Sequence, residues 1–473
     1  MDKLRLDNYK SKIITYGVTG KEVTCKAYLG ITYCEYPVDT IQKLNIFVPA
    51  AYYRGEAING YSQCTAPIFL PNTVGGYMPG FADEPVYNAE TGKVNAVFAA
   101  LEHGYVVVSG GVRGRTTGKG KAPALIVDMK AIIRFIRYNR DLMPGDVERI
   151  VTNGTSAGGA LSALAGASGD SMDFEPYLAE IGAASERDDI FAASCYCPIH
   201  NLEHADAAYE WQFGGLRDYH RTKHLNTENG YIRIPEDGDM TDRQMSLSEK
   251  LKALFPAYVN SLKLTDENGE SLSLNTDGEG SFLNYIKAQI LNSAQRELDK
   301  KDSAKQWSDL VVKGSAVEMH PAISVQTKKA LDVDWKTYVK AMTRMKPAPA
   351  FDATDLTSPE NEEFGSDEFN ARHFTAFSME NTEVEAQMAP QYLIKMLNPL
   401  EYISKAKTAK YWRIRHGAYD RDTSLAIPVI LNLYLLKHGY NVDFFLPWGL
   451  PHSGDYDLEE LFEWIDKICR EGE

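Results

Sequence analysis

The segment Gly154-Thr155-Ser156-Ala157-Gly158 places a serine between two glycines, in the pattern G-x-S-x-G. The apolar run 149–154 before it predicts a strand, and the small residues from Ala157 onward predict a helix. In this strand–turn–helix setting such a serine is exposed as a nucleophile, because the flanking glycines let the helix turn back on the strand. The motif predicts Ser156 as a nucleophile, while a tight turn without chemistry is the alternative reading.

A serine hydroxyl needs a base to take its proton, and after such an elbow an acid and then a histidine follow along the chain. His452 lies directly after the predicted strand 442–448, and Asp420 and Asp422 follow the predicted strand 411–417. His416, at the end of that strand, precedes both acids and breaks the expected order. The sequence predicts His452 as the base, and the spacing leaves the choice between Asp420 and Asp422 open.

An oxyanion that develops during acyl transfer needs backbone N–H donors. The residue after the nucleophile, Ala157, supplies one of them. The second is expected from a glycine-rich loop after an early strand, and Gly75 and Gly76 follow the predicted strand 66–72. We expect Gly76 to be this donor, and a Gly-Gly turn without a role is the alternative.

Two further motifs suggest competing chemistry. The segment HNLEH, residues 200–204, matches the zinc-peptidase pattern H-x-x-E-H, in which a helix would carry both histidines on one face. No third ligand can be identified for it. The glycine-rich segment 110–123 fails the phosphate-loop pattern because Lys119 is followed by Gly120. We expect a solvated loop there, structured by Arg113 or Arg115.

Composition narrows the class of protein. The chain has 473 residues, 44% of them hydrophobic, and a formal net charge of −15. This excess of acidic residues argues against nucleic acid or an anionic membrane as a partner. Neither an apolar signal segment nor a run long enough to span a membrane is evident, so a cytoplasmic location is expected. The six cysteines fit no disulfide framework, and Cys195 and Cys197 are expected on one face of a strand, packed in the core.

Strand and helix patterns alternate at both ends of the chain. Strands are expected at 44–50, 66–72, 105–111, 149–154, 190–199, 411–417 and 442–448, and helices at 96–104, 125–142, 424–439 and 458–470. Between them, amphipathic helices are expected at 246–264 and 281–300. Alternating elements predict a mostly parallel sheet covered by helices. We therefore expect an α/β core, residues 1–199 and 397–473, split by a mainly helical insertion at 200–396.

Seven long motifs in the chain resemble the bacterial tannases, or tannin acylhydrolases, of the lactobacillus type. They are NTVGGY, GVRGRTT, NGTSAGGALSALAGASG, YCPIHNLEHADAAYEWQF, FDATDLTSPEN, RIRHGAYDRDTSLAIPVI and LPHSGDYDLEELF. The resemblance runs over almost the whole chain. It implies an α/β-hydrolase fold with a large lid, and a serine esterase that cleaves galloyl esters.

The resemblance also implies roles for individual residues. It selects Asp420 as the acid of a triad with Ser156 and His452, and makes Asp422 a ligand of the galloyl group. Lys346 and Glu360 match the residues that bind the phenolic hydroxyls, and Ile199 and Pro359 match an apolar pair that flanks the ring. HNLEH recurs in this family without a zinc role. No metal or organic cofactor is implied, and the oligomeric state is left open.

Three alternative functions remain. An esterase for other phenolic acids, such as ferulate, would share the fold and the serine. A zinc peptidase would use HNLEH. A non-catalytic phenol-binding protein would use neither the serine nor HNLEH for a reaction. The residues that resemble the galloyl site, Lys346, Glu360 and Asp422, favour an ester with several free hydroxyls, because carboxylates accept hydrogen bonds from them and an ammonium donates to their oxygens.

Overall fold

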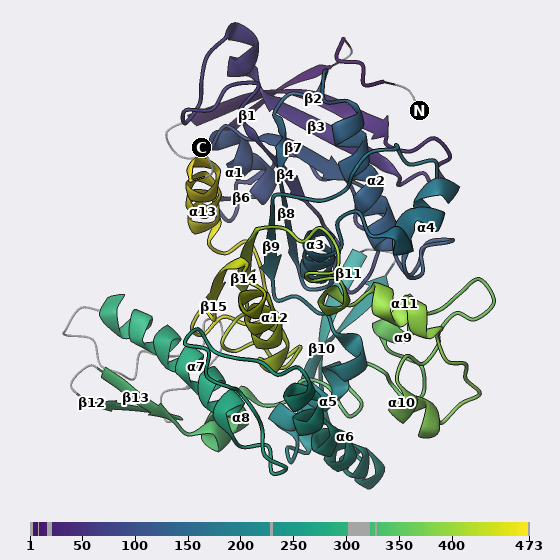
Figure 1. Ribbon diagram of the computed structural model, residues 1–473, viewed down its shortest axis with the longest axis vertical. Helices are drawn as coiled ribbons and strands as arrows, with labels where there is room; N and C mark the ends of the chain where they lie inside the picture. The colour runs from purple at the N-terminus through teal and green to yellow at the C-terminus, as the bar shows by residue number, and fades with distance from the viewer. Residues whose placement is uncertain are drawn as a thin grey trace.

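The computed structural model describes residues 3–7, 9–16, 21–227, 230–300, 322–326 and 329–471. In these residues a nine-stranded sheet has the strand order β1-β2-β3-β7-β4-β8-β9-β14-β15 (Figure 1). Its strands are β1 (Lys10–Tyr16), β2 (Lys21–Thr32), β3 (Lys43–Pro49), β7 (Val106–Gly110), β4 (Pro67–Pro71), β8 (Asp146–Thr155), β9 (Ala192–Tyr196), β14 (Tyr411–Arg415) and β15 (Asn441–Phe445).

The sheet has an antiparallel edge and a parallel body. The three pairings β1–β2, β2–β3 and β3–β7 are antiparallel. Every further pairing across the sheet, from β7 to β15, is parallel. The seven strands expected from the sequence all belong to this sheet. The sequence analysis missed the edge strand β1 and its neighbour β2, whose charged, polar and apolar residues follow no regular alternation. Every residue of the inner strands β4, β7, β9 and β14 is buried, whereas β15 at the other edge of the sheet is only half-buried. Strands buried on both faces, such as β7, read as continuous apolar runs.

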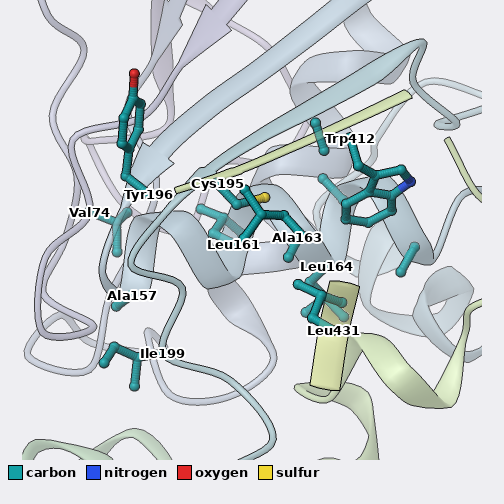
Figure 2. Packing of buried hydrophobic residues seen from close by; sticks show 14 of the residues in the cluster. Val74, Ala157, Leu161, Ala163, Leu164, Cys195, Tyr196, Ile199, Trp412 and Leu431 are labelled. Carbon is teal, nitrogen blue, oxygen red and sulfur yellow. The ribbon is translucent and has the colours of Figure 1, made fainter. Parts of the chain in front are cut away.

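Helices cover both faces of the parallel strands. Figure 1 shows α1 (Ala96–Glu102) and α13 (Leu458–Arg470) on one side, and α2 (Ala124–Tyr138), α3 (Ala157–Ala167) and α12 (Ala426–Lys437) on the other. Every residue of α3 is buried, because its small side chains let the helix lie close to the sheet. At Gly166 a Cβ would lie 2.8 Å from the Trp412 ring. Leu161, Leu164 and Trp412 pack together in this layer (Figure 2).

The chain leaves the sheet after β9 and returns to it at β14. This insertion carries helices α5 (Leu202–Phe213), α6 (Asp242–Ser261), α7 (Ser281–Lys300), α8 (Trp335–Met342), α9 (Pro359–Glu363), α10 (Ala376–Glu380) and α11 (Gln391–Met396). The described residues of the insertion also form two antiparallel hairpins, β10 (Asp218–Thr227) with β11 (Gly230–Asp239) and β12 (Ile323–Gln326) with β13 (Lys329–Val333). The sequence analysis did not predict the hairpins. The boundaries 200–396 stay a prediction.

Two smaller elements complete the core: the short pair β5 (Tyr87–Asn88) and β6 (Lys93–Val94), and helix α4 (Glu175–Glu180). Among the described residues, no helix combines the length and the apolar character that a membrane crossing needs. All six cysteines lie in the described part of the chain and are free.

Candidate active site

Ser156 lies on a sharp turn between β8 and α3, as the sequence predicts. Its backbone has φ 64° and ψ −126°, a conformation that side chains rarely adopt and that marks a strained turn. The Ser156 N–H donates to the Tyr196 carbonyl at 2.9 Å, which fixes the turn to the neighbouring strand. A Cβ at Gly154 would lie 2.3 Å from the Gly158 carbonyl oxygen, so the close approach of helix and strand requires glycine here.

Asp420 and His452 follow the ends of the two adjacent strands β14 and β15. Nδ1 of His452 lies 2.7 Å from Oδ2 of Asp420, and the Asp422 backbone N–H donates to Oδ1 of Asp420 at 2.8 Å. Asp420 is fully buried. Burial alone would raise the pKa of its carboxyl, but the His452 and His416 imidazoles outweigh burial and hold this pKa far below its usual range. The environment of Asp420 therefore favours a carboxylate beside Nδ1 of His452.

Asp422 is placed differently from Asp420. Its Oδ2 lies 3.3 Å from Nε2 of His452, and its Oδ1 lies 2.6 Å from Nζ of Lys346. The two aspartates that the spacing could not separate therefore contact different ring nitrogens of His452: Asp420 contacts Nδ1, and Asp422 contacts Nε2. Burial lowers the pKa of His452, but the charges of Asp420 and Asp422 outweigh burial and raise it well above its usual range.

A cavity of about 540 Å³ adjoins the Ser156 turn. Eight of the ten residues that the sequence analysis selected line it: Gly76, Ser156, Ala157, Ile199, Lys346, Pro359, Glu360 and Asp422. The other two, Asp420 and His452, connect to it through the contact of His452 with Asp422. Residues that follow strands of the core thus share one cavity with residues of the insertion, from the loop of Lys346 and from helix α9. Figure 2 shows Ala157 and Ile199 beside each other at the near end of α3.

Charges of both signs meet in the cavity. Burial disfavours the charged form of Lys346, but the carboxylates of Asp422 and Glu360 outweigh burial and raise the pKa of its ammonium. Burial raises the pKa of Glu360, and the Lys346 charge counteracts only part of that effect. The Lys346 Nζ also lies 4.1 Å from the centre of the Phe351 ring. Two carboxyl groups and one ammonium can together bind adjacent hydroxyls on a small ring.

Gly76 lies in the loop after β4 with a positive φ of 54°. The Nε of Arg115 donates to the Gly76 carbonyl at 2.8 Å. Arg115 belongs to the segment 110–123, so this segment helps to hold the Gly76 backbone in place. The expectation that Arg113 or Arg115 structures that loop agrees with this contact and with the ion pair of Arg113 with Asp128 at 2.8 Å. Tyr77, which the sequence analysis missed, lines the cavity and donates its hydroxyl to the Ile199 carbonyl at 2.8 Å.

A fully buried ion pair holds the loop that carries Lys346. Arg344 donates from Nη2 to Oε1 of Glu210 at 2.6 Å and from Nε to the Lys346 carbonyl at 2.8 Å. Neither side chain of the pair is exposed. Glu210 belongs to α5, so the loop is attached to the first helix of the insertion. The sequence analysis did not predict this pair, because its members lie far apart along the chain.

A second buried network holds the loop before Glu360. The backbone N–H groups of Phe351 and Asp352 donate to the Asp206 carboxylate of α5 at 2.8 and 3.0 Å. Asp352 in turn accepts from Asn361 Nδ2 at 2.6 Å, and Asn361 follows Glu360 in α9. Burial, with the nearby Asp352 charge, raises the pKa of Asp206 to about 7. Helix α5 therefore anchors both segments that bring insertion residues to the cavity.

HNLEH does not form a ligand set. Helix α5 begins at Leu202 and Asn201 has a positive φ of 56°, so His200 precedes the helix and the two histidines do not share a helical face. The His204 ring stacks on Tyr258 with centroids 3.5 Å apart. Glu203 accepts from Gln391 at 2.8 Å. The described residues hold one group of three ligand-type side chains within metal-binding reach, and HNLEH contributes nothing to it.

The expectation that Cys195 and Cys197 share one strand face is wrong. Strand β9 ends at Tyr196, and Cys197 follows it with a positive φ of 44°. Cys195 packs in the core beside Leu161 (Figure 2). Cys197 instead lies with His416 and Asp420, where their Sγ, ring nitrogen and carboxylate oxygen are all within 4.8 Å of one another. The sequence analysis could not predict this difference, because the spacing of the two cysteines does not reveal that Cys197 has a left-handed backbone conformation.

The parallel sheet, the serine at its elbow, and an acid and a histidine in order after it place the chain among the α/β-hydrolases. Residues 75–205 match the family model described as BD-FAE. A tannase from Lactobacillus plantarum is 48% identical, with 99% of each chain covered and a TM-score of 0.91. A Fusobacterium nucleatum tannase is 46% identical, again with 99% of each chain covered and a TM-score of 0.90.

A further structure, a tannin acyl hydrolase in complex with ethyl gallate, is 49% identical, covers 99% of this chain and 98% of its own, and has a TM-score of 0.89. The comparison with curated protein sequences found no match. At this identity over the full length, the chain belongs to the tannase family, and the fold and family expected from its sequence are confirmed.

Proposed function

We propose that this protein is a serine esterase that hydrolyses galloyl esters and releases gallic acid. The observation that carries the proposal is that one cavity joins the Ser156 turn to the cluster of Lys346, Glu360 and Asp422. The turn supplies a nucleophile, and the cluster supplies partners for adjacent phenolic hydroxyls. The relative with ethyl gallate in its structure supports the same substrate class.

In the proposed mechanism His452, oriented by Asp420, takes the proton of Ser156 as the serine oxygen attacks the ester carbonyl. The N–H groups of Ala157 and Gly76 stabilise the oxyanion. Ala157 is suited to this role because, as the first residue of α3, its N–H has no acceptor within the helix. The protonated His452 then donates to the leaving alcohol, and water hydrolyses the galloyl-serine through the same base.

Specificity in this proposal comes from the polar cluster. Asp422 and Glu360 accept from the ring hydroxyls, Lys346 donates to their oxygens, and the apolar side chains of Ile199 and Pro359 lie against the ring faces. An ester without these hydroxyls leaves the charged groups without partners, and such a site can discriminate by about 10⁴-fold. We also propose that residues 200–396 act as the lid, since Lys346 and Glu360 both belong to this range.

The experiment that tests the proposal is the release of gallic acid from methyl gallate by the purified protein, with methyl ferulate and methyl benzoate beside it. We expect methyl gallate to have the highest kcat/KM. A higher value for methyl ferulate would favour the alternative of an esterase for other phenolic acids. No turnover of any ester, together with gallate binding, would favour the non-catalytic phenol-binding protein.

A further inference from the structure

Cys197 and His416 lie beside Asp420 of the proposed triad, and neither of these two residues has a part in the proposed mechanism. All three residues are buried. His416 is the most informative of them, because neither of its ring nitrogens has a hydrogen-bond partner among the described residues, although the ring has no exposed surface. Burial of an imidazole that makes no hydrogen bond is unfavourable, so a ligand that bonds to a ring nitrogen would be stabilised there.

The spacing of the three donors suits a metal ion. Tetrahedral Zn²⁺ with bonds of about 2.0–2.3 Å to nitrogen, oxygen and sulfur holds its ligand atoms roughly 3.3–3.7 Å apart. Nδ1 of His416 lies 3.6 Å from Oδ2 of Asp420, and all three donor atoms lie within 4.8 Å of one another. Thiolate, imidazole and carboxylate are ligands that thiophilic divalent cations prefer.

We propose that Cys197, His416 and Asp420 form an inhibitory site for a thiophilic divalent cation such as Zn²⁺. On binding, the Cys197 thiol releases its proton to solvent, and the cation bonds to the thiolate sulfur, a His416 ring nitrogen and an Asp420 carboxylate oxygen. A fourth position stays open for water. This site is distinct from the zinc pattern HNLEH, and the ion is an inhibitor rather than a cofactor.

Inhibition follows from the shared carboxylate. Oδ2 of Asp420, which lies nearest to His416, is also the atom that contacts Nδ1 of His452 at 2.7 Å. A cation bonded there displaces His452 from its orienting partner. The inhibition therefore rests on the proposed role of Asp420, whereas the binding of the cation does not. The three residues are buried, and the Cys197 thiol donates to the Ser453 carbonyl at 3.3 Å. A cation can bond to the sulfur only after this hydrogen bond breaks, so inhibition should develop slowly.

The test uses Co²⁺ as a spectroscopic probe and Zn²⁺ as the inhibitor of the wild-type enzyme. Co²⁺ should give a thiolate-to-metal charge-transfer band that saturates at one ion per chain, and Zn²⁺ should inhibit ester hydrolysis reversibly with EDTA. The Cys197→Ala variant should lose the band and need at least roughly 100-fold more Zn²⁺ for half-inhibition, because even outer-shell changes cost about 10–100-fold in affinity.

Two matched variants test whether any thiol would serve. Cys64 is exposed and Cys195 is buried two residues away, so Cys64→Ala and Cys195→Ala should both keep the band and the inhibition. If Cys197→Ala does not fold, His416→Gln should weaken Co²⁺ binding to a similar extent. The absence of a band in the wild type, or a band that survives in Cys197→Ala, would overturn the site. Bound Co²⁺ with full esterase activity would overturn the link to Asp420 instead.

Discussion

The Ser156 turn and the Lys346 loop face the same cavity, yet the chain positions them by different means. Ser156, Asp420 and His452 follow the ends of parallel strands, and backbone hydrogen bonds of the sheet fix where those ends lie. Lys346 lies on an irregular segment of the insertion and Glu360 in the short helix α9, and buried side-chain networks to α5 hold both segments. The first region depends on strand order, and the second depends on a few charged pairs between residues far apart along the chain.

This difference predicts two kinds of effect for substitutions in the two regions. A change at the turn should remove the reaction and leave the fold intact, because the serine side chain contributes little to packing. A change in the α5 networks should first reduce stability and then blur substrate choice. Four substitutions test this comparison, from the largest expected effect to the smallest.

Ser156→Ala should lower kcat for methyl gallate by roughly 10⁶-fold, as removal of a serine nucleophile does in other serine hydrolases. The thermal unfolding midpoint should stay close to that of the wild type. Ser453→Ala, which removes the half-buried hydroxyl that donates to the Pro451 carbonyl at 3.1 Å, is the control and should stay active. Activity of Ser156→Ala within tenfold of the wild type would exclude Ser156 as the nucleophile.

Arg344→Met should lower the free energy of unfolding by about 3–5 kcal/mol, because it leaves the Glu210 carboxylate buried without its counter-charge. Denaturant titration measures this loss. Arg217→Met is the matched control in the insertion: Arg217 pairs with the largely exposed Asp242, so its loss should leave stability almost unchanged. Equal stability of the two variants would contradict the anchoring role of the buried pair.

Lys346→Met should lower kcat/KM for methyl gallate by about 10²-fold, the loss expected for a hydrogen bond to a charged group worth about 3 kcal/mol. For methyl benzoate, which has no ring hydroxyls, kcat/KM should change little. The ratio of the two substrates is the measurement. An equal loss for both would mean that Lys346 supports the structure of the cavity rather than substrate choice.

Asp422→Asn should move the acid limb of the kcat/KM profile to lower pH by about one unit, the size expected when a neighbouring charge is removed. Only neutral His452 can accept the serine proton, so activity falls as pH falls through the pKa of His452. The Asp420 and Asp422 charges raise this pKa, and removing one of them lowers it. Lys346→Met should leave the limb in place. A limb that moves upward in Asp422→Asn would contradict the assignment.

The same contrast explains how much the sequence could predict. The parallel strands, α3 and α7 are strongly patterned, and the elbow glycines identify the Ser156 turn without any relative. Asp420 could not be separated from Asp422 by spacing, since both follow the same strand, and the family resemblance was needed. The pairs of Arg344 with Glu210 and of Asp206 with the 351–352 backbone escaped prediction because only the folded chain brings them together.

Asp422 contacts both the Lys346 ammonium and the His452 ring. In the proposed function, one carboxylate is thus a shared component of two properties that enzyme engineers usually adjust separately, the choice of substrate and the working pH. A redesign that replaces it to admit an ester with fewer hydroxyls will also shift the range in which the base is neutral. A substitution of Asp422 should therefore change both properties at once, and a second substitution near His452 is needed to change them separately.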